Sequence, residues 1–69
     1  MENLLTLDDK RLCIRYALGK LDIDDQLRIE HLAIKLWQWV IMNHPTVPWT
    51  IQYSLELLAA IGMKLKEEK

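Results

Sequence analysis

The residues best suited to acid–base or nucleophilic chemistry are two histidines and one cysteine, and they lie far apart in the sequence. His31 has Glu30 and Lys35 as charged neighbours, which supply neither a nucleophile nor a group that would orient the imidazole for catalysis. His44 precedes a proline in a connecting segment, and Cys13 lies among apolar residues of helical spacing without a nearby histidine. We therefore predict surface histidines, a buried thiol and a chain that is not an enzyme.

Motifs for metals and cofactors are missing from the sequence. One cysteine and two histidines lack the paired spacing of a zinc site, and a single thiol cannot close an internal disulfide. The acidic group of Asp22, Asp24 and Asp25 lacks the central glycine and the distant glutamate of a calcium loop, which favours a role in helix capping. Only two glycines are present, and no phosphate-binding motif occurs. We expect no cofactor and no metal.

The composition is that of a small globular domain. Of the 69 residues, 51% are hydrophobic and 28% are charged, with a net charge of −1. No apolar run approaches the roughly 18 residues of a membrane span, and the N-terminus lacks the basic and apolar regions of a signal peptide. The sequence therefore predicts a soluble, cytoplasmic protein that does not enter membranes.

Turn-forming residues cluster in two short segments, 19–25 and 43–48, and separate three stretches with helical spacing of apolar residues. This pattern predicts an all-α fold, a small three-helix bundle in a single domain that spans 1–69. The helices are expected at 7–20, 23–43 and 47–65, followed by a frayed tail at 66–69.

Candidate capping residues precede or follow each expected helix. The Thr6 hydroxyl can accept a hydrogen bond from the first turn of the first helix, and Gly19 can end that helix. The acidic run that begins at Asp22 can cap the second helix. Thr46 or Val47 is expected to cap the third, which places a proline in its first turn.

The second expected helix is apolar around most of its circumference. Its polar side chains occupy an arc of only roughly 80 to 100 degrees, at 100 degrees per residue. A helix of this kind is normally buried in a large protein or a membrane, and this chain is neither. We therefore predict that homodimerisation completes the bundle. The residues nominated for self-association are Leu36, Trp37, Val40, Ile41 and Leu58.

Two further features concern contacts between helices and with other proteins. Ser54 and Gly62 lie two turns apart in the main apolar stripe of the third helix, so a neighbouring helix can approach its backbone there. Large side chains beside the polar arc or on the second face of the first helix can anchor a foreign protein. The residues nominated for partner binding are Leu12, Tyr16, Leu32, Trp39 and Met42.

By elimination, the sequence predicts a small oligomeric helical module that binds and modulates a larger protein or assembly, as an inhibitor, adaptor or assembly factor. Its partners would be itself and that larger protein. The alternative is a dimeric DNA-binding transcriptional regulator that uses the basic arc of the second helix. Balanced charge and the apolar character of that helix weigh against the alternative. The nucleic-acid residues would be Arg28, His31, Lys35 and Gln38.

Overall fold

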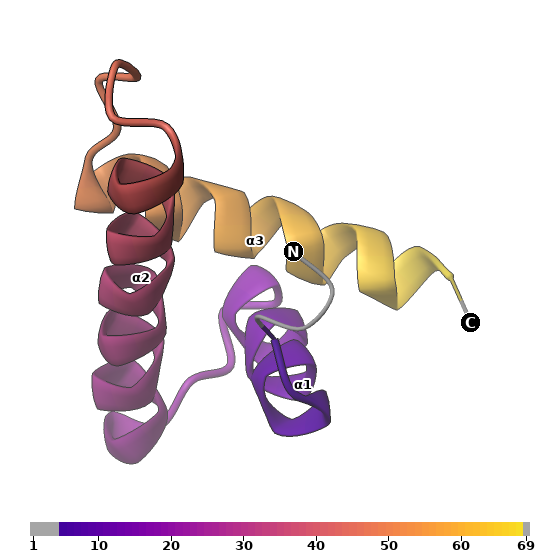
Figure 1. Cartoon of the computed structure of the whole chain (residues 1–69). Helices are drawn as coiled ribbons and strands as arrows, with labels where there is room; N and C mark the ends of the chain where they lie inside the picture. Colours follow the sequence, from indigo (N-terminus) through magenta and orange to yellow (C-terminus); the bar gives the residue numbers. More distant parts are fainter. Residues whose placement is uncertain (1–4, 69) are drawn as a thin grey trace.

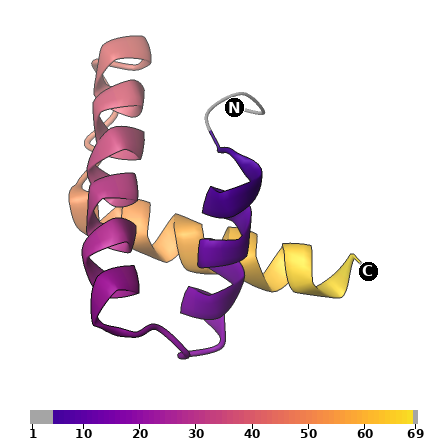
Figure 2. The same ribbon diagram turned by 90° about the horizontal axis from the view of Figure 1, so that it is seen from below.

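The computed structural model describes residues 5–68 and contains three helices joined by two turns (Figure 1). These are α1 (Leu7–Ala17), α2 (Ile23–Asn43) and α3 (Ile51–Glu67). No strand occurs within residues 5–68, so the all-α class is confirmed, with three helices packed together. Helices α1 and α2 run side by side in opposite directions, and α3 crosses both (Figure 2).

The first two helices begin at the predicted capping residues. The Thr6 hydroxyl accepts a hydrogen bond from the Asp9 amide, and the Asp9 carboxylate accepts one from the Thr6 amide, both at 3.1 Å. This reciprocal pair is a capping box, which satisfies two amides that the helix itself leaves without partners. At the start of α2, a carboxylate oxygen of Asp22 accepts a hydrogen bond of 2.8 Å from the Asp25 amide.

Helix α1 ends at Ala17, three residues before the end of the expected span at 7–20. Gly19 adopts a φ of +70°, a left-handed conformation that only glycine adopts without strain. Its amide donates to the Tyr16 carbonyl at 3.0 Å, and the Lys20 amide donates to the Arg15 carbonyl at 2.9 Å. These two bonds form a Schellman motif, which closes the helix before the chain turns toward α2.

Helix α3 begins at Ile51, so the expectation of a start at 47 with a cap at Thr46 or Val47 is wrong. The Val47 amide instead donates to the His44 carbonyl at 3.1 Å, which forms a turn. The residue before each proline is biased toward extended backbone, which keeps this segment out of a helix. Thr50 is the next side chain that can cap, and its hydroxyl accepts from the Tyr53 amide at 3.1 Å.

The C-terminal part of α3 is longer than predicted. The expected helix at 47–65 was to be followed by a frayed tail at 66–69, but α3 continues to Glu67. Lys64 and Lys66 lie in its last turn, where positive charge stabilises the negative end of the helix dipole. Lys69 lies outside the described residues.

The core is formed by side chains from all three helices of the single chain. Three residues nominated for self-association, Leu36, Val40 and Leu58, are buried in it, as are Leu12 and Leu32, which were nominated for partner binding. Those five assignments need correction, because other side chains of the same chain already enclose all five residues. The buried apolar residues are Leu12, Cys13, Ile29, Leu32, Ala33, Leu36, Val40 and Leu58.

The sequence predicts a close helix approach at Ser54 and Gly62, and α1 makes such an approach at Gly62. Both are buried in α3. A Cβ atom at Gly62 would overlap the Cys13 carbonyl of α1 and lie 3.0 Å from the Cβ atom of Ala17. The Ser54 hydroxyl accepts a hydrogen bond of 2.7 Å from the indole nitrogen of Trp49. This bond fixes the end of the segment that connects α2 to α3 against α3.

Candidate interaction surface on helix α2

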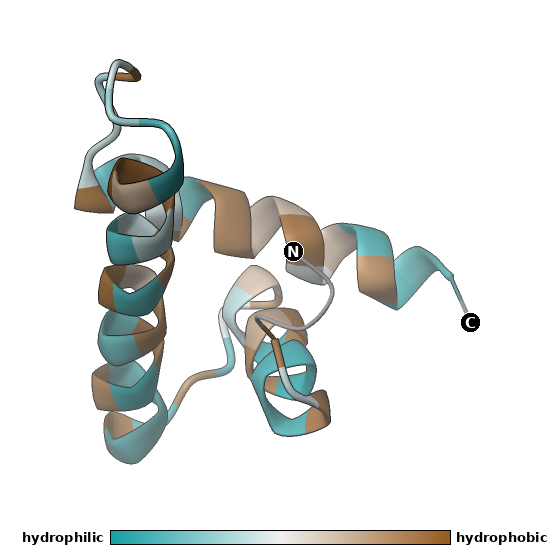
Figure 3. Cartoon of the chain, in the orientation of Figure 1, coloured by the Kyte–Doolittle hydropathy of each residue, from teal (hydrophilic) through white to brown (hydrophobic). Residues whose placement is uncertain are grey.

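Helix α2 carries a second apolar stripe that the core does not use. Figure 3 shows apolar positions repeated along the whole length of the helix. The stripe follows alternating steps of four and three residues, which keep side chains on one helical face. We call this stripe the outer seam, and it consists of Ile23, Leu27, Glu30, Ile34, Trp37 and Ile41.

Residues 5–68 leave most of the outer seam uncovered. Ile23, Leu27 and Ile34 are 84%, 58% and 38% exposed. Trp37 and Ile41 are half-buried. At 100 degrees per residue, the centre of the seam lies roughly 130 degrees around the helix from the centre of the buried face. The two apolar faces of α2 are therefore distinct, and only one of them is covered by other residues within the described range 5–68.

Periodicity, and not mere exposure, sets the outer seam apart. Isolated exposed apolar side chains are common on soluble proteins and need no explanation. Here a run of them shares one face over a helix of 21 residues, interrupted only by Glu30. Such a face is what a neighbouring helix packs against.

The nominated residues are distributed over several parts of the molecule. Of the self-association set, Trp37 and Ile41 lie in the outer seam. Of the partner-binding set, Tyr16 and Trp39 are half-buried against the core, and Met42 is 80% exposed. The partner-binding set therefore forms no single surface. Sequence reasoning also left Ile23, Leu27 and Ile34 out of the self-association set, although their regular spacing was a usable signal.

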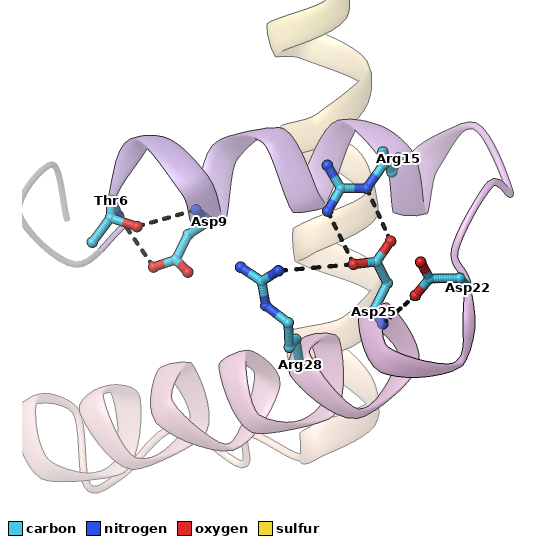
Figure 4. A network of polar contacts seen from close by, with 6 residues as sticks. All are labelled: Thr6, Asp9, Arg15, Asp22, Asp25 and Arg28. Carbon is cyan, nitrogen blue, oxygen red and sulfur yellow. Dashed lines mark hydrogen bonds and ion pairs between the residues drawn. The ribbon is translucent and has the colours of Figure 1, made fainter.

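An ion-pair network holds the start of α2 against α1 (Figure 4). The guanidinium of Arg15 donates two hydrogen bonds of 3.0 Å, from Nε and Nη2, to the two carboxylate oxygens of Asp25. The Arg28 Nη1 atom lies 3.9 Å from the same carboxylate. Hydrogen bonding and charge from Arg15 lower the pKa of Asp25 despite the opposing effect of burial. The same hydrogen bonds, with the negative charge of Asp25, raise the pKa of Arg15. This bidentate pair fixes the direction in which α2, and with it the outer seam, leaves the turn.

A groove of about 220 Å³ lies between α1 and α2, on another side of α2 from the outer seam. Three of the four residues nominated for nucleic acid, Arg28, His31 and Lys35, line it, whereas Gln38 is not among the lining residues. Asp9 lies across the groove from these three residues, on α1. Its carboxylate accepts a hydrogen bond from the Thr6 amide. The groove is lined by Asp9, Leu12, Arg28, His31, Leu32 and Lys35.

The groups nominated first for chemistry are not brought together. Cys13 is fully buried, and burial, helped by the charge of Asp9, raises the pKa of its thiol to about 11. His31 and His44 are exposed, and the His44 ring makes an edge contact with Trp39 at 5.9 Å between ring centres. Within residues 5–68, no three His, Cys, Asp or Glu side chains gather in a way that could hold a metal ion.

Neither a membrane-spanning helix nor a similarity to known proteins indicates a function. None of the described helices combines the length and apolar character needed to cross a bilayer. The chain matches no protein-family model, no curated protein and no solved structure. The surfaces of the molecule itself are thus the basis for assigning a function.

Proposed function

We propose that the chain is a self-associating helical interaction module that binds and modulates a larger protein or assembly, as an inhibitor, adaptor or assembly factor. The outer seam of α2 supports this proposal, because it is a regular apolar face that the described part of the chain leaves mostly uncovered. A helix with apolar residues on two faces packs against neighbours on both. One neighbour is the chain's own core, and a second copy supplies the other.

The energetics favour an association that depends on concentration. Full burial of one large aliphatic side chain stabilises by roughly 1.5 to 3 kcal/mol. The exposed parts of Ile23, Leu27 and Ile34 in two copies therefore offer a gain on the order of 7 kcal/mol. Association itself costs about 4 to 15 kcal/mol, a range that includes this gain, so the further burial of Trp37 and Ile41 adds to the stability of the dimer.

Light scattering coupled to size exclusion tests the self-association. We expect a mass of two chains at high protein concentration and a fall toward one chain on dilution. Leu27→Asp should give a monomer, because the seam would then bury a carboxylate without a partner. Its helical circular dichroism should persist, since Leu27 is 58% exposed in the single chain.

The matched control is Lys35→Asp, which introduces the same carboxylate on the same helix but outside the outer seam. This variant should retain the mass of the wild-type chain. A wild-type protein that stays strictly monomeric at millimolar concentration and melts cooperatively would contradict the proposal. Dissociation of both variants to the same extent would also contradict it, because the effect would then not be specific to the seam.

The proposal that the chain modulates a larger protein is tested on a protein that it binds. The tagged chain is used to isolate a binding protein from the native host, and the activity of that protein is then measured with and without added chain. We expect the chain to change the activity in proportion to binding. A binding protein whose activity is unchanged at saturation contradicts modulation.

A second candidate is a dimeric DNA-binding regulator, which is favoured by the position of Arg28, His31 and Lys35 along one groove. Against it stand the carboxylate of Asp9 across that groove and the net charge of −1. Binding to DNA would fall steeply with salt and would drop in a variant with Arg28→Ala and Lys35→Ala. The control removes two lysines of α3, Lys64 and Lys66. No shift of DNA at low salt excludes this candidate.

A further inference from the structure

The outer seam has the spacing of a heptad repeat. Steps of four and three residues place Leu27, Ile34 and Ile41 at one type of seam position and Ile23, Glu30 and Trp37 at the other. We infer that the seam pairs with the same seam of a second copy in an antiparallel arrangement, and this inference rests on the proposed self-association. The two-fold axis of that pair lies at the level of Leu32.

This register follows from matching every seam position with a facing residue. With the axis level with Leu32, Ile23 faces the partner's Ile41, and Leu27 faces the partner's Trp37. Glu30 then faces the partner's Ile34. A shift by one heptad would leave two seam residues at one end of each helix uncovered, either Trp37 and Ile41 or Ile23 and Leu27. The symmetric register therefore buries the most apolar surface that an antiparallel pair can bury.

A parallel pair in register would also match every position, but it is disfavoured at the centre of the seam. It places Glu30 directly opposite the partner's Glu30, so two like charges would meet in an apolar interface. In the antiparallel pair the same two residues are offset along the axis by four residues, or about 6 Å at 1.5 Å per residue. Each carboxylate then faces the partner's Ile34 in place of a second carboxylate.

The start of α2 gives a second, independent reason. Asp22 and Asp24 are exposed at this end. Parallel pairing would bring the acidic ends of both copies together. Antiparallel pairing separates them by the length of the helix, about 30 Å, which is well beyond the screening length of about 8 Å in physiological salt.

Side-chain volume gives a third reason. A parallel pair would stack Trp37 on the partner's Trp37 in one layer and would leave smaller residues in the other layers. The antiparallel register instead pairs each tryptophan with a leucine and each terminal isoleucine with an isoleucine. Layers of similar volume pack more densely, with fewer voids along the seam.

Disulfide trapping between differently tagged chains tests the arrangement. Ile23→Cys and Ile41→Cys are oxidised separately and as a mixture, then blocked, denatured and resolved without reductant. We expect a covalent dimer between unlike chains in the mixture and almost none in either variant alone. Wild-type protein is one control, because Cys13 is fully buried. Lys64→Cys, at an exposed site on α3, measures trapping by random collision.

Each other outcome is informative. Covalent dimers formed by each variant with itself would overturn the antiparallel inference and leave the proposed self-association in place. Trapping no faster than that of Lys64→Cys, in samples that light scattering shows to be dimeric, would also overturn it, because another surface would hold the copies together. No trapping in samples that are monomeric at all concentrations would contradict the proposed self-association itself.

The role of Glu30 is tested separately. Glu30→Leu removes the charged residue of the seam, so we expect the dimer to tighten about tenfold or more. Because the penalty on parallel pairing is also removed, Ile23→Cys combined with Glu30→Leu should begin to form covalent dimers with itself. Glu56→Leu, an exposed substitution on α3, should do neither. Unchanged or weaker association of Glu30→Leu would overturn the position assigned to this residue.

Discussion

Arg15 and Asp25 form a bidentate pair across the turn between α1 and α2, with both hydrogen bonds at 3.0 Å. The Asp25 side chain is only 10% exposed, so it has little water to replace a lost partner. We expect Arg15→Met to lower the thermal midpoint by several degrees, because methionine keeps the apolar part of the side chain and removes only the charged donors. The control is Arg28→Met, whose guanidinium is 3.9 Å from the same carboxylate. Equal losses in the two variants would contradict a special role for Arg15.

The same carboxylate makes stability depend on pH. Its pKa in the folded chain is lowered from the ordinary value of 3.8, chiefly by hydrogen bonding from Arg15. A lowered folded pKa means that the stabilisation is fully present above 3.8 and is lost as the pH falls from that value through the folded pKa. Melting curves at pH 7 and near pH 3 should therefore separate more for wild type than for Asp25→Asn. An equal separation would show that other carboxylates dominate.

Gly62 should tolerate no side chain. Alanine is the better helix former by about 1 kcal/mol, so a helix without tertiary contacts would gain from Gly62→Ala. Here the added Cβ would overlap the Cys13 carbonyl, and α1 would have to move away from α3. We expect a net loss of about 1 to 3 kcal/mol in the free energy of unfolding, measured in urea. Lys64→Ala, on the exposed side of α3, should change it by less than about 0.5 kcal/mol.

Trp49 and Ser54 should show energetic coupling. The indole nitrogen donates to a fully buried hydroxyl at 2.7 Å, so either single change leaves a polar atom without its partner. Ser54→Ala and Trp49→Phe should each destabilise by about 1 to 2 kcal/mol in addition to any loss of packing. The double variant should lose less than the two single losses combined. Simple additivity in this cycle would argue against the hydrogen bond.

Features set by a few neighbouring residues were predictable from the sequence. Thr6 and Asp22 cap their helices, and Gly19 closes α1, because each acts on backbone groups within a few residues. The start of α3 was not predictable in the same way. Several hydroxyl-bearing or turn-forming residues compete between 43 and 50, and the two prolines leave Thr50 as the cap.

Which face of α2 is buried depends on contacts between distant residues. Periodicity shows that two faces are apolar, but it does not tell which one α1 and α3 will cover. Leu36 and Val40 were therefore assigned to a surface between copies, although they lie in the core of one chain. The apolar part of the candidate site, in contrast, is visible in the regular spacing of Ile23, Leu27 and Ile34.

The ion pair at the turn was missed for a related reason. Asp25 was interpreted only as part of a capping group, and Arg15 lies ten residues earlier, on another helix. Sequence distance alone gives no sign that these side chains meet. The pairing becomes evident only once the Schellman turn at Gly19 has reversed the chain and placed the end of α1 beside the start of α2.

The crossing of α3 over both other helices has a consequence for how the chain is made. Helices α1 and α2 touch each other sparingly, and most of their packing is with α3. During translation they emerge from the ribosome first, before the helix on which both depend. Until α3 follows, the nascent chain exposes apolar side chains to its surroundings, so newly made molecules would be most vulnerable to proteases and chaperone binding in that interval.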